Sequence, residues 1–259
     1  KTVCPEPMSS LIDLKSFGRD LNVAVFGATG GIGKALTLSL STNPNTQSIF
    51  AISRSKNEYA SPKITSLQVD IDNEHDIVRV AKAVMSTVSE LHIVLIATGI
   101  LRVGDNIKPE KSWRALERVS MEAVFRVNAI GPALVAKHFL PLLAQNRKSV
   151  FAALSARVGS IEDNRLGGWY AYRSSKAALN MLIRTLSIEL ARLNPSALCV
   201  GLHPGTVNTS LSKPYQGSVS KGRLFSVERS AKHLINVLNG LQPEQSGQVF
   251  AWDGKPIPF

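Results

Sequence analysis

Two side chains that could move a proton stand four residues apart in the stretch GWYAYRSSK, residues 168–176: the phenol of Tyr172 and the ammonium of Lys176. Positions i and i+4 lie on the same face of a helix, so the two groups can be neighbours. A phenol with its ordinary pKa of about 10 exchanges protons poorly at neutral pH, and a nearby ammonium lowers that pKa. The pair is therefore suited to general acid–base chemistry, while Tyr170, which pairs with Ser174 in the same register, is expected to pack or to line a pocket. A solvated helix start with aromatic packing is the alternative interpretation.

A glycine-rich turn, GATGGIG at residues 27–33, comes much earlier in the chain. It follows the apolar run NVAVF, residues 22–26, and opens a helix-like segment. Glycines in such a turn let the backbone approach a pyrophosphate, and the helix N-terminus offers unpaired N–H groups and the positive end of its dipole. This strand–turn–helix arrangement predicts a dinucleotide site. A tight turn without a ligand is the alternative.

Strand-like and helix-like segments alternate along the chain. The expected strands are 22–26, 48–53, 64–69, 92–97, 149–154, 196–202 and 248–252. The expected helices are 32–41, 72–89, 113–128, 133–145, 172–193 and 226–239. The strands are continuously apolar, which is typical of a parallel sheet covered on both faces. The sequence therefore predicts an α/β fold in a single domain: a doubly wound parallel sheet of about seven strands with helices on both faces.

We expect this domain to cover residues 21–259 and residues 1–20 to form a flexible N-terminal extension. In doubly wound sheets the ligand crevice lies beyond the carboxyl ends of the strands. The irregular segments 101–111, 159–171 and 204–222 are therefore the candidate substrate loops.

The ordered motifs resemble the short-chain dehydrogenase/reductase family from about residue 22 to the end. The spacing of Gly27, Gly31 and Gly33, followed far downstream by Tyr172 and Lys176, carries this resemblance. The chain looks most similar to the C-factor and sniffer-type carbonyl reductase branch, which has a Rossmann fold. The stretches that suggest the branch are RVGSI at 157–161, YAYR at 170–173, SKAALN at 175–180 and GQVFAWDG at 247–254.

The resemblance implies roles for single residues. Tyr172 would give a proton to a developing alkoxide, Lys176 would tune Tyr172 and hold the nicotinamide ribose, and Asn128 would anchor a water leading to Lys176. The cofactor would be held at positions around the strand ends: Gly27, Thr29, Gly30, Gly31, Ile32, Gly33, Ser53, Arg54, Asp70, Ile71, Ala97, Thr98, Gly99, Tyr172, Lys176, Pro204, Gly205, Val207 and Thr209.

The end of the second expected strand indicates which cofactor is bound. Arg54 follows this strand, and no acid occurs between Ile49 and Lys56. An acid there would bind a ribose 2′-hydroxyl, whereas an arginine favours a 2′-phosphate. NADP(H) is therefore expected rather than NAD(H), with a solvated loop charge as the alternative role of Arg54.

Two departures from the family pattern affect the site. The usual catalytic serine position falls on Ala156, so Ser155, one residue earlier, is the candidate that would bind the substrate oxygen, with Ser160 as a substitute. Neighbouring residues on a strand point to opposite faces, so a serine at position 155 instead of 156 could point away from the substrate. The sequence IATG at 96–99 stands where the family usually has Asn-Asn-Ala-Gly, and we interpret this as variation.

The leading hypothesis is an NADP(H)-dependent carbonyl reductase with an apolar pocket formed by Trp169, Leu166 and Leu211. The alternative is a cofactor-binding signalling or regulatory protein with little turnover, motivated by Ala156. The formal charge of +11, from 30 basic and 19 acidic residues, motivates a third hypothesis of nucleic-acid association. The chain has no basic block or nucleic-acid motif, so no nucleic-acid partner is expected.

Compartment, metal and assembly follow from weaker signals. Two cysteines, Cys4 and Cys199, form no disulfide framework, and the sequence shows no signal core. The longest apolar run, 93–101, is too short for a bilayer, so a cytoplasmic protein without a membrane partner is expected. The five histidines lack ligand spacing, so no metal is expected. A small-molecule carbonyl or alcohol is the expected partner, and the resemblance implies a homodimer or homotetramer.

Overall fold

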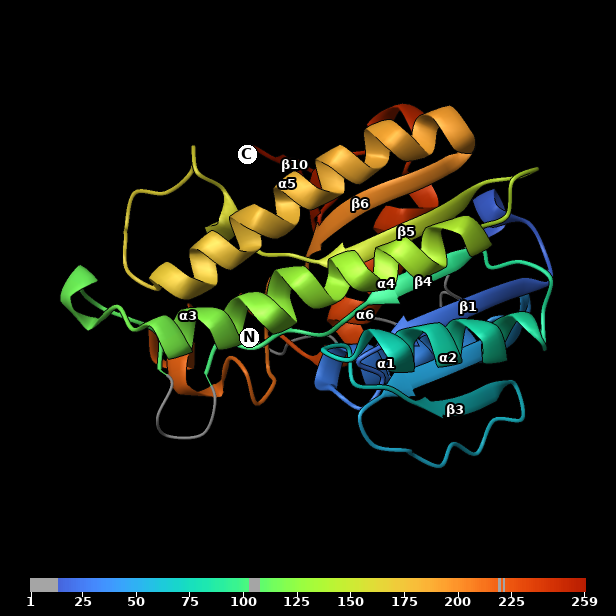
Figure 1. Cartoon of the computed structure of the whole chain (residues 1–259), viewed down its shortest axis with the longest axis horizontal. Coiled ribbons are helices and arrows are strands. Elements are labelled where there is room, and N and C mark those ends of the chain that lie inside the picture. Colours follow the sequence, from blue (N-terminus) through green and yellow to red (C-terminus); the bar gives the residue numbers. More distant parts are fainter. Residues whose placement is uncertain (1–13, 103–107, 219, 221) are drawn as a thin grey trace, which may run out of the picture.

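A parallel β-sheet forms the centre of the molecule (Figure 1). The computed structural model describes residues 14–102, 108–218, 220 and 222–259. Its main sheet has eight strands in the order β10-β9-β6-β5-β4-β1-β2-β3. Their bounds are β1 (Leu21–Phe26), β2 (Thr46–Ser53), β3 (Ile64–Gln68), β4 (Ile93–Ile96), β5 (Ser149–Leu154), β6 (Ala197–His203), β9 (Val249–Ala251) and β10 (Pro256–Ile257). A separate pair joins β7 (Thr206–Val207) to β8 (Leu224–Phe225).

The order of the strands changes direction between the central strands β1 and β4. The chain builds outward from β1 to β3 on one side and from β4 to β9 on the other. Seven of the eight strands run parallel, and only β10 pairs in the antiparallel direction. The predicted doubly wound fold is confirmed, and it places a ligand crevice beyond the carboxyl ends of β1 and β4.

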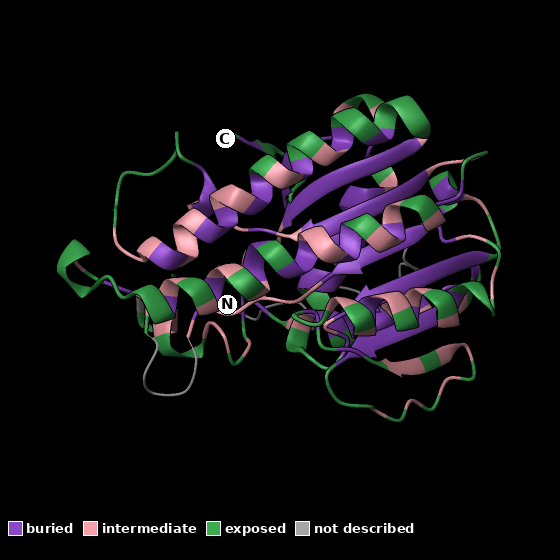
Figure 2. Cartoon of the chain, in the orientation of Figure 1, coloured by how far each residue is buried: buried purple, intermediate pink, exposed green. Residues whose placement is uncertain are grey.

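Helices cover both faces of the sheet. One face carries α1 (Gly31–Ser41) and α6 (Val227–Gly240), and the other carries α2 (Glu74–Met85), α4 (Gly131–Phe139) and α5 (Tyr170–Leu193). Because side chains alternate along a strand, Val23 and Val25 of β1 join the first core while Ala24 and Phe26 join the second. Figure 2 shows the result: the inner strands are buried almost throughout, whereas the helices are buried mainly where they meet the sheet.

One long helix replaces the two helices expected at 113–128 and 133–145. The short turn η2 (Trp113–Ala115) comes first, and α3 (Arg118–Phe125) then continues through the π-helical segment η3 (Arg126–Ile130) into α4 and η4 (Leu140–Leu142). Pro132 has no N–H to donate, and the wider turn of η3, in which the Gly131 N–H bonds to Arg126 O, carries the helix past it. The predicted break between residues 128 and 133 is therefore wrong.

Among the described helices, this 25-residue rod is the one whose length and composition would allow it to cross a membrane. A core helix passes the same test. Val135, Ala136 and Phe139 are fully buried in the core between the rod and the sheet, so the apolar character has a structural cause here.

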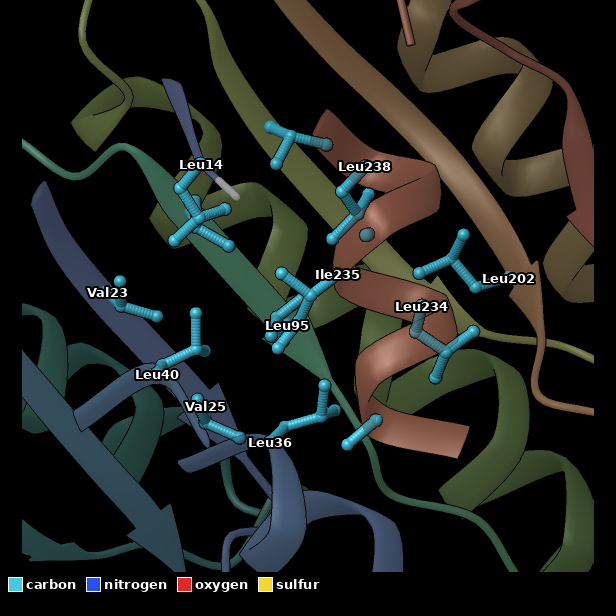
Figure 3. Close-up of a cluster of buried hydrophobic side chains, with 14 of the residues drawn as sticks. Leu14, Val23, Val25, Leu36, Leu40, Leu95, Leu202, Leu234, Ile235 and Leu238 are labelled. Carbon is cyan, nitrogen blue, oxygen red and sulfur yellow. The ribbon is translucent and has the colours of Figure 1, made fainter. Parts of the chain in front are cut away.

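The segment that precedes β1 is packed into the first core. Leu14 and Phe17 are each 1% exposed, and Leu14 belongs to the same cluster of buried side chains as Leu238 of α6 (Figure 3). Lys148 holds the same segment: its Nζ donates to Ser16 Oγ over 2.9 Å and lies 4.5 Å from the Phe17 ring centroid. Residues 14–17 of the expected N-terminal extension therefore pack onto the domain, while residues 1–13 lie outside the described residues.

We expect Phe17→Ala to lower the free energy of unfolding by about 3–5 kcal/mol, because it removes a fully buried ring and leaves a cavity. Urea unfolding followed by circular dichroism measures the change. Val119→Ala, at a side chain that is 70% exposed, is the matched control and should change stability by less than about 0.5 kcal/mol. Equal effects of the two variants would contradict the packing of this segment.

Candidate active site

The glycine turn after β1 is shaped by close backbone contacts. Gly27 has a φ of 77°, and a Cβ there would lie 2.9 Å from the Ala97 carbonyl carbon. A Cβ on Gly33 would lie 2.1 Å from Gly27 O, which no side chain could tolerate. The turn therefore needs glycine at both positions, and it leads directly into the 11-residue helix α1. This is the geometry in which backbone N–H groups at a helix N-terminus bind a phosphate.

A cleft of about 240 Å³ opens beside this turn. It is lined by ten of the residues predicted to hold the cofactor: Gly27, Thr29, Gly30, Ser53, Arg54, Asp70, Ile71, Ala97, Thr98 and Gly99. Four further lining residues were not predicted: Val69, Asp72, Ile100 and Val127. Each of the four is adjacent in sequence to a predicted site residue. The expectation that ligands bind beyond the carboxyl ends of the strands could therefore have included them.

The outer end of the cleft carries charged groups. Arg54 follows β2 and is exposed, and the Ser53 hydroxyl before it donates to Ser55 O over 2.7 Å. Asp72, which also lines the cleft, pairs with Arg126 at 2.9 Å. An exposed guanidinium at this position could bind a phosphate bidentately, while Asp72 already has a cationic partner.

The remaining predicted cofactor positions lie outside this cleft. Thr209 packs on the turn, since a Cβ on Gly31 would lie 2.8 Å from its Cγ2. Ile32 packs against the first core. Pro204, Gly205 and Val207 follow β6, and the Pro204 carbonyl accepts a bond from Ser230 Oγ over 3.0 Å. Their predicted contacts with the cofactor stay predictions.

Asn128 ties the π-helical segment to the loop after β4. Its Oδ1 accepts from Ile100 N over 2.8 Å, and its Nδ2 donates to Ile100 O over 2.9 Å and to Ser175 Oγ over 3.1 Å. The side chain is fully buried. A Cβ on Gly99 would lie 3.6 Å from Asn128 Oδ1 and 3.7 Å from Lys176 Nζ, so the glycine, the amide and the ammonium meet at one place.

Tyr172 and Lys176 lie in the first two turns of α5, as the spacing predicts. Lys176 is 2% exposed, and its Nζ donates to Leu154 O at the end of β5 over 2.7 Å. The same nitrogen lies 5.9 Å from the centroid of the Tyr172 ring. Gly159 makes room for the lysine, because a Cβ there would lie 2.7 Å from Lys176 Cβ. The structure thus brings Asn128 and Lys176 together beside Gly99, with Tyr172 next to Lys176.

Burial shifts both titratable groups toward their neutral forms. It raises the pKa of Tyr172 to about 12 and lowers the pKa of Lys176 to about 8, because removal from water disfavours the charged form. In the protein alone, burial outweighs the lowering of the Tyr172 pKa that was expected from Lys176. At neutral pH Tyr172 holds its proton and Lys176 is mostly charged.

A protein-family model described as short chain dehydrogenase matches residues 21–218. The chain belongs to the short-chain dehydrogenase family. An uncharacterized oxidoreductase of Schizosaccharomyces pombe is 28% identical over 256 residues, which cover 91% of this dehydrogenase and 96% of the relative. The C-signal protein of Myxococcus xanthus is 37% identical over 151 residues, covering 57% and 85% of the two chains.

Solved structures of carbonyl reductases share the whole fold of this dehydrogenase. The NADPH-bound carbonyl reductase from chicken fatty liver is 28% identical, with a TM-score of 0.80 over 93% of this chain and 100% of that one. The carbonyl reductase Sniffer of Drosophila melanogaster, at 23% identity, has the same fold with a TM-score of 0.79 over the same shares of the two chains. Together with the C-signal relative, these likenesses confirm the predicted resemblance to the C-factor and sniffer-type branch.

The serine predicted to bind the substrate oxygen has another partner in this dehydrogenase. Ser155 is 3% exposed, and its Oγ donates to Oδ1 of Asn180, one turn beyond Lys176 on α5, over 2.6 Å. A hydroxyl has one proton to donate, so this bond ties β5 to α5 instead of serving a substrate. Ser160 accepts from Asp163 N over 3.0 Å and holds its own loop. The role predicted for Ser155 is therefore not supported by its contacts.

We expect Ser155→Ala to lower the free energy of unfolding by about 1–3 kcal/mol, because it leaves the buried Asn180 oxygen without its donor. Turnover of a carbonyl substrate should change little. Ser174→Ala, which removes a hydroxyl bonded only within its own helix, is the control for stability. Loss of oxyanion donors in other enzymes costs on the order of a hundredfold or more in rate, so a loss of that size in Ser155→Ala would contradict this assignment.

Two further aromatic rings, those of Trp169 and Tyr215, lie on the side of Tyr172 where a substrate is expected. Trp169 lies 6.2 Å from Tyr172 and 5.0 Å from Tyr215 of η6 (Lys213–Ser218), measured between ring centroids. Leu211 is half-buried, but Leu166 is 91% exposed, so the prediction that Leu166 lines the pocket is wrong. Residues 103–107, 219 and 221 of the predicted substrate loops lie outside the described residues.

Proposed function

We propose that this dehydrogenase is an NADP(H)-dependent carbonyl reductase in which Tyr172 gives a proton to the substrate oxygen. The observation that carries the proposal is that Asn128 and Lys176 lie beside Gly99, which lines the glycine-turn cleft, with the Tyr172 ring next to Lys176. The name of the chicken enzyme, an NADPH-bound carbonyl reductase 28% identical to this chain, supports the same reaction.

The residues of the cleft fit a dinucleotide. The glycine turn leaves no room for a Cβ at Gly27 or Gly33, the α1 N-terminus faces the phosphate position, and Arg54 suits a 2′-phosphate. Thr98 Oγ1, on the cleft wall, is buried without a hydrogen-bond partner in the described structure, as expected of a group that a ligand satisfies. Lys176 and Asn128 would lie at the nicotinamide end.

Reduction needs a hydride for the carbonyl carbon and a proton for the carbonyl oxygen. Bound NADPH supplies the hydride. Tyr172 supplies the proton as its O–H bond breaks and the new O–H bond forms on the substrate. Burial raises the pKa of Tyr172 to about 12, so the phenol is protonated at neutral pH, as a proton donor must be. The charged Lys176 then stabilises the phenolate that remains, and a proton from solvent restores the phenol.

We expect the protein to bind NADPH more tightly than NADH, and Arg54→Ala to weaken NADPH binding by about 10–100-fold, the effect of losing a charge-assisted bond. Quenching of tryptophan fluorescence during titration measures both affinities. NADH affinity of the same variant is the internal control and should stay unchanged, because NADH lacks the 2′-phosphate. If neither nucleotide binds, the reductase proposal fails.

We expect Tyr172→Phe to lower the rate of NADPH-dependent reduction of a 1,2-diketone by about 10²–10⁴-fold, the usual contribution of a general acid. Tyr170→Phe removes the same hydroxyl two residues away and should keep most of the activity. The decrease in absorbance at 340 nm follows both reactions, and NADPH titration shows that each variant still binds the cofactor. A loss in Tyr170→Phe that equals the loss in Tyr172→Phe would overturn the assignment.

A second function has a specific observation in its favour. Ser155 is bonded to Asn180, and C-signal is among the relatives of this chain. A cofactor-binding regulator with little turnover would need the cleft but no serine beside Tyr172. Tight NADPH binding without reduction of any carbonyl in a broad screen would favour this function over the reductase.

A further inference from the structure

Glu110, an acid in the loop that leads to η2, is 5% exposed and binds the start of α5. Its backbone carbonyl accepts from Trp169 N over 2.6 Å, and its carboxylate Oε2 accepts from Ala171 N over 3.2 Å. Trp169 is the N-cap residue of α5, and Ala171 lies in its first turn, where N–H groups have no partner within the helix. A negative charge is also favourable at this end of the helix dipole.

The residue between these contacts has a strained backbone. Trp169 has φ 52° and ψ 44°, in the left-handed region that side chains other than glycine rarely adopt. Gly167 and Gly168 before it also have positive φ angles, of 60° and 66°, at no such cost. Strain of this kind persists only where the surroundings fix it, and the bonds from Glu110 lie on both sides of Trp169.

The strained conformation decides where the indole ring lies. The ring packs edge-on against Tyr172 and tilted against Tyr215, so it stands between the proton donor and the loop after β6. Burial raises the pKa of Tyr215, and the guanidinium of Arg102, in the loop after β4, lies close enough to oppose this shift. The three loops that follow β4, β5 and β6 therefore meet around Trp169.

We propose that Glu110 is a positioning residue that holds Trp169 in its left-handed conformation, and that Trp169 determines which carbonyl substrates reach Tyr172. Glu110 touches no reacting atom in this scheme; it acts through the indole. The ring offers a flat apolar face, so carbonyl compounds that carry an aromatic group should be favoured over aliphatic ones. This proposal rests on the proposed reductase function and adds a substrate preference to it.

The test compares two diketones with the same reacting group, 1-phenyl-1,2-propanedione and 2,3-hexanedione. We expect Glu110→Ala to raise KM for the aryl compound by about 3–10-fold, the range for loss of one aromatic contact, with a smaller change for the alkyl compound. NADPH affinity should stay unchanged, because Glu110 does not line the cofactor cleft. Glu110→Gln keeps an oxygen acceptor for Ala171 N and should restore most of the preference.

Two further variants separate positioning from general damage. Glu117→Ala changes an exposed acid seven residues along, which makes no cap bond to α3, and should leave both KM values unchanged. Trp169→Gly relieves the strain and removes the ring, so Glu110→Ala added to it should not change the KM ratio further. An additional change in the double variant, or an unchanged ratio in both Glu110 variants, would overturn the proposal.

A measurement without turnover distinguishes failure of this proposal from failure of the reductase function. In a Trp113→Phe, Trp252→Phe background, Trp169 is the single tryptophan of the chain. Glu110→Ala should make its fluorescence more sensitive to acrylamide, with Glu110→Gln in between. This result in a protein that reduces no carbonyl would support the positioning role and refute the reductase. Quenching equal to the parent in both Glu110 variants would refute the positioning role, and if Glu110→Ala does not fold, Glu110→Gln decides.

Discussion

The buried amide of Asn128 is the interaction on which the site depends. A side-chain amide taken out of water must find partners for its donor and acceptor atoms, or it destabilises the fold. Here it finds Ile100 N, Ile100 O and Ser175 Oγ. These bonds join three elements that lie far apart in sequence: the long helix, the loop after β4 and the helix α5. Gly99 and Lys176 are positioned as a consequence.

The fold could be predicted from the sequence because its signals are local and repeated. Each apolar strand and each amphipathic helix is visible in the residue pattern, and the glycine turn marks the first crossover. The errors came where the signal depends on tertiary packing. Pro132 predicts a helix break, but the π-helical turn before it removes the conflict. Leu14 and Phe17 are too few to reveal a core segment, and β10 has only two residues, one of them a proline.

The site could be predicted in position but not in bonding. The residues at the strand ends and the Tyr172–Lys176 spacing follow from the order of motifs. The hydrogen-bond partner of a hydroxyl does not follow from this order. The sequence shows Ser155 one position before the usual serine position, Ala156, and only the structure shows that Ser155 bonds to Asn180. The pKa of Tyr172 is raised rather than lowered, because burial, which the spacing of Tyr172 and Lys176 does not reveal, disfavours the phenolate. Glu110 gave no signal at all, since an acid in an irregular loop looks solvated until its partners are known.

The π-helical turn at 126–130 also constrains how the length of this chain can vary. A π turn holds one residue more than the α turn it replaces. The side chains after the turn are therefore rotated about the helix axis by about 100° from where an uninterrupted α-helix would place them. Loss of one residue there would restore regular winding and rotate one half against the other. Either Asn128 would leave the β4 loop, or Val135 and Phe139 would leave the sheet. Homologous chains that keep both contacts should therefore tolerate substitutions in this turn far better than deletions.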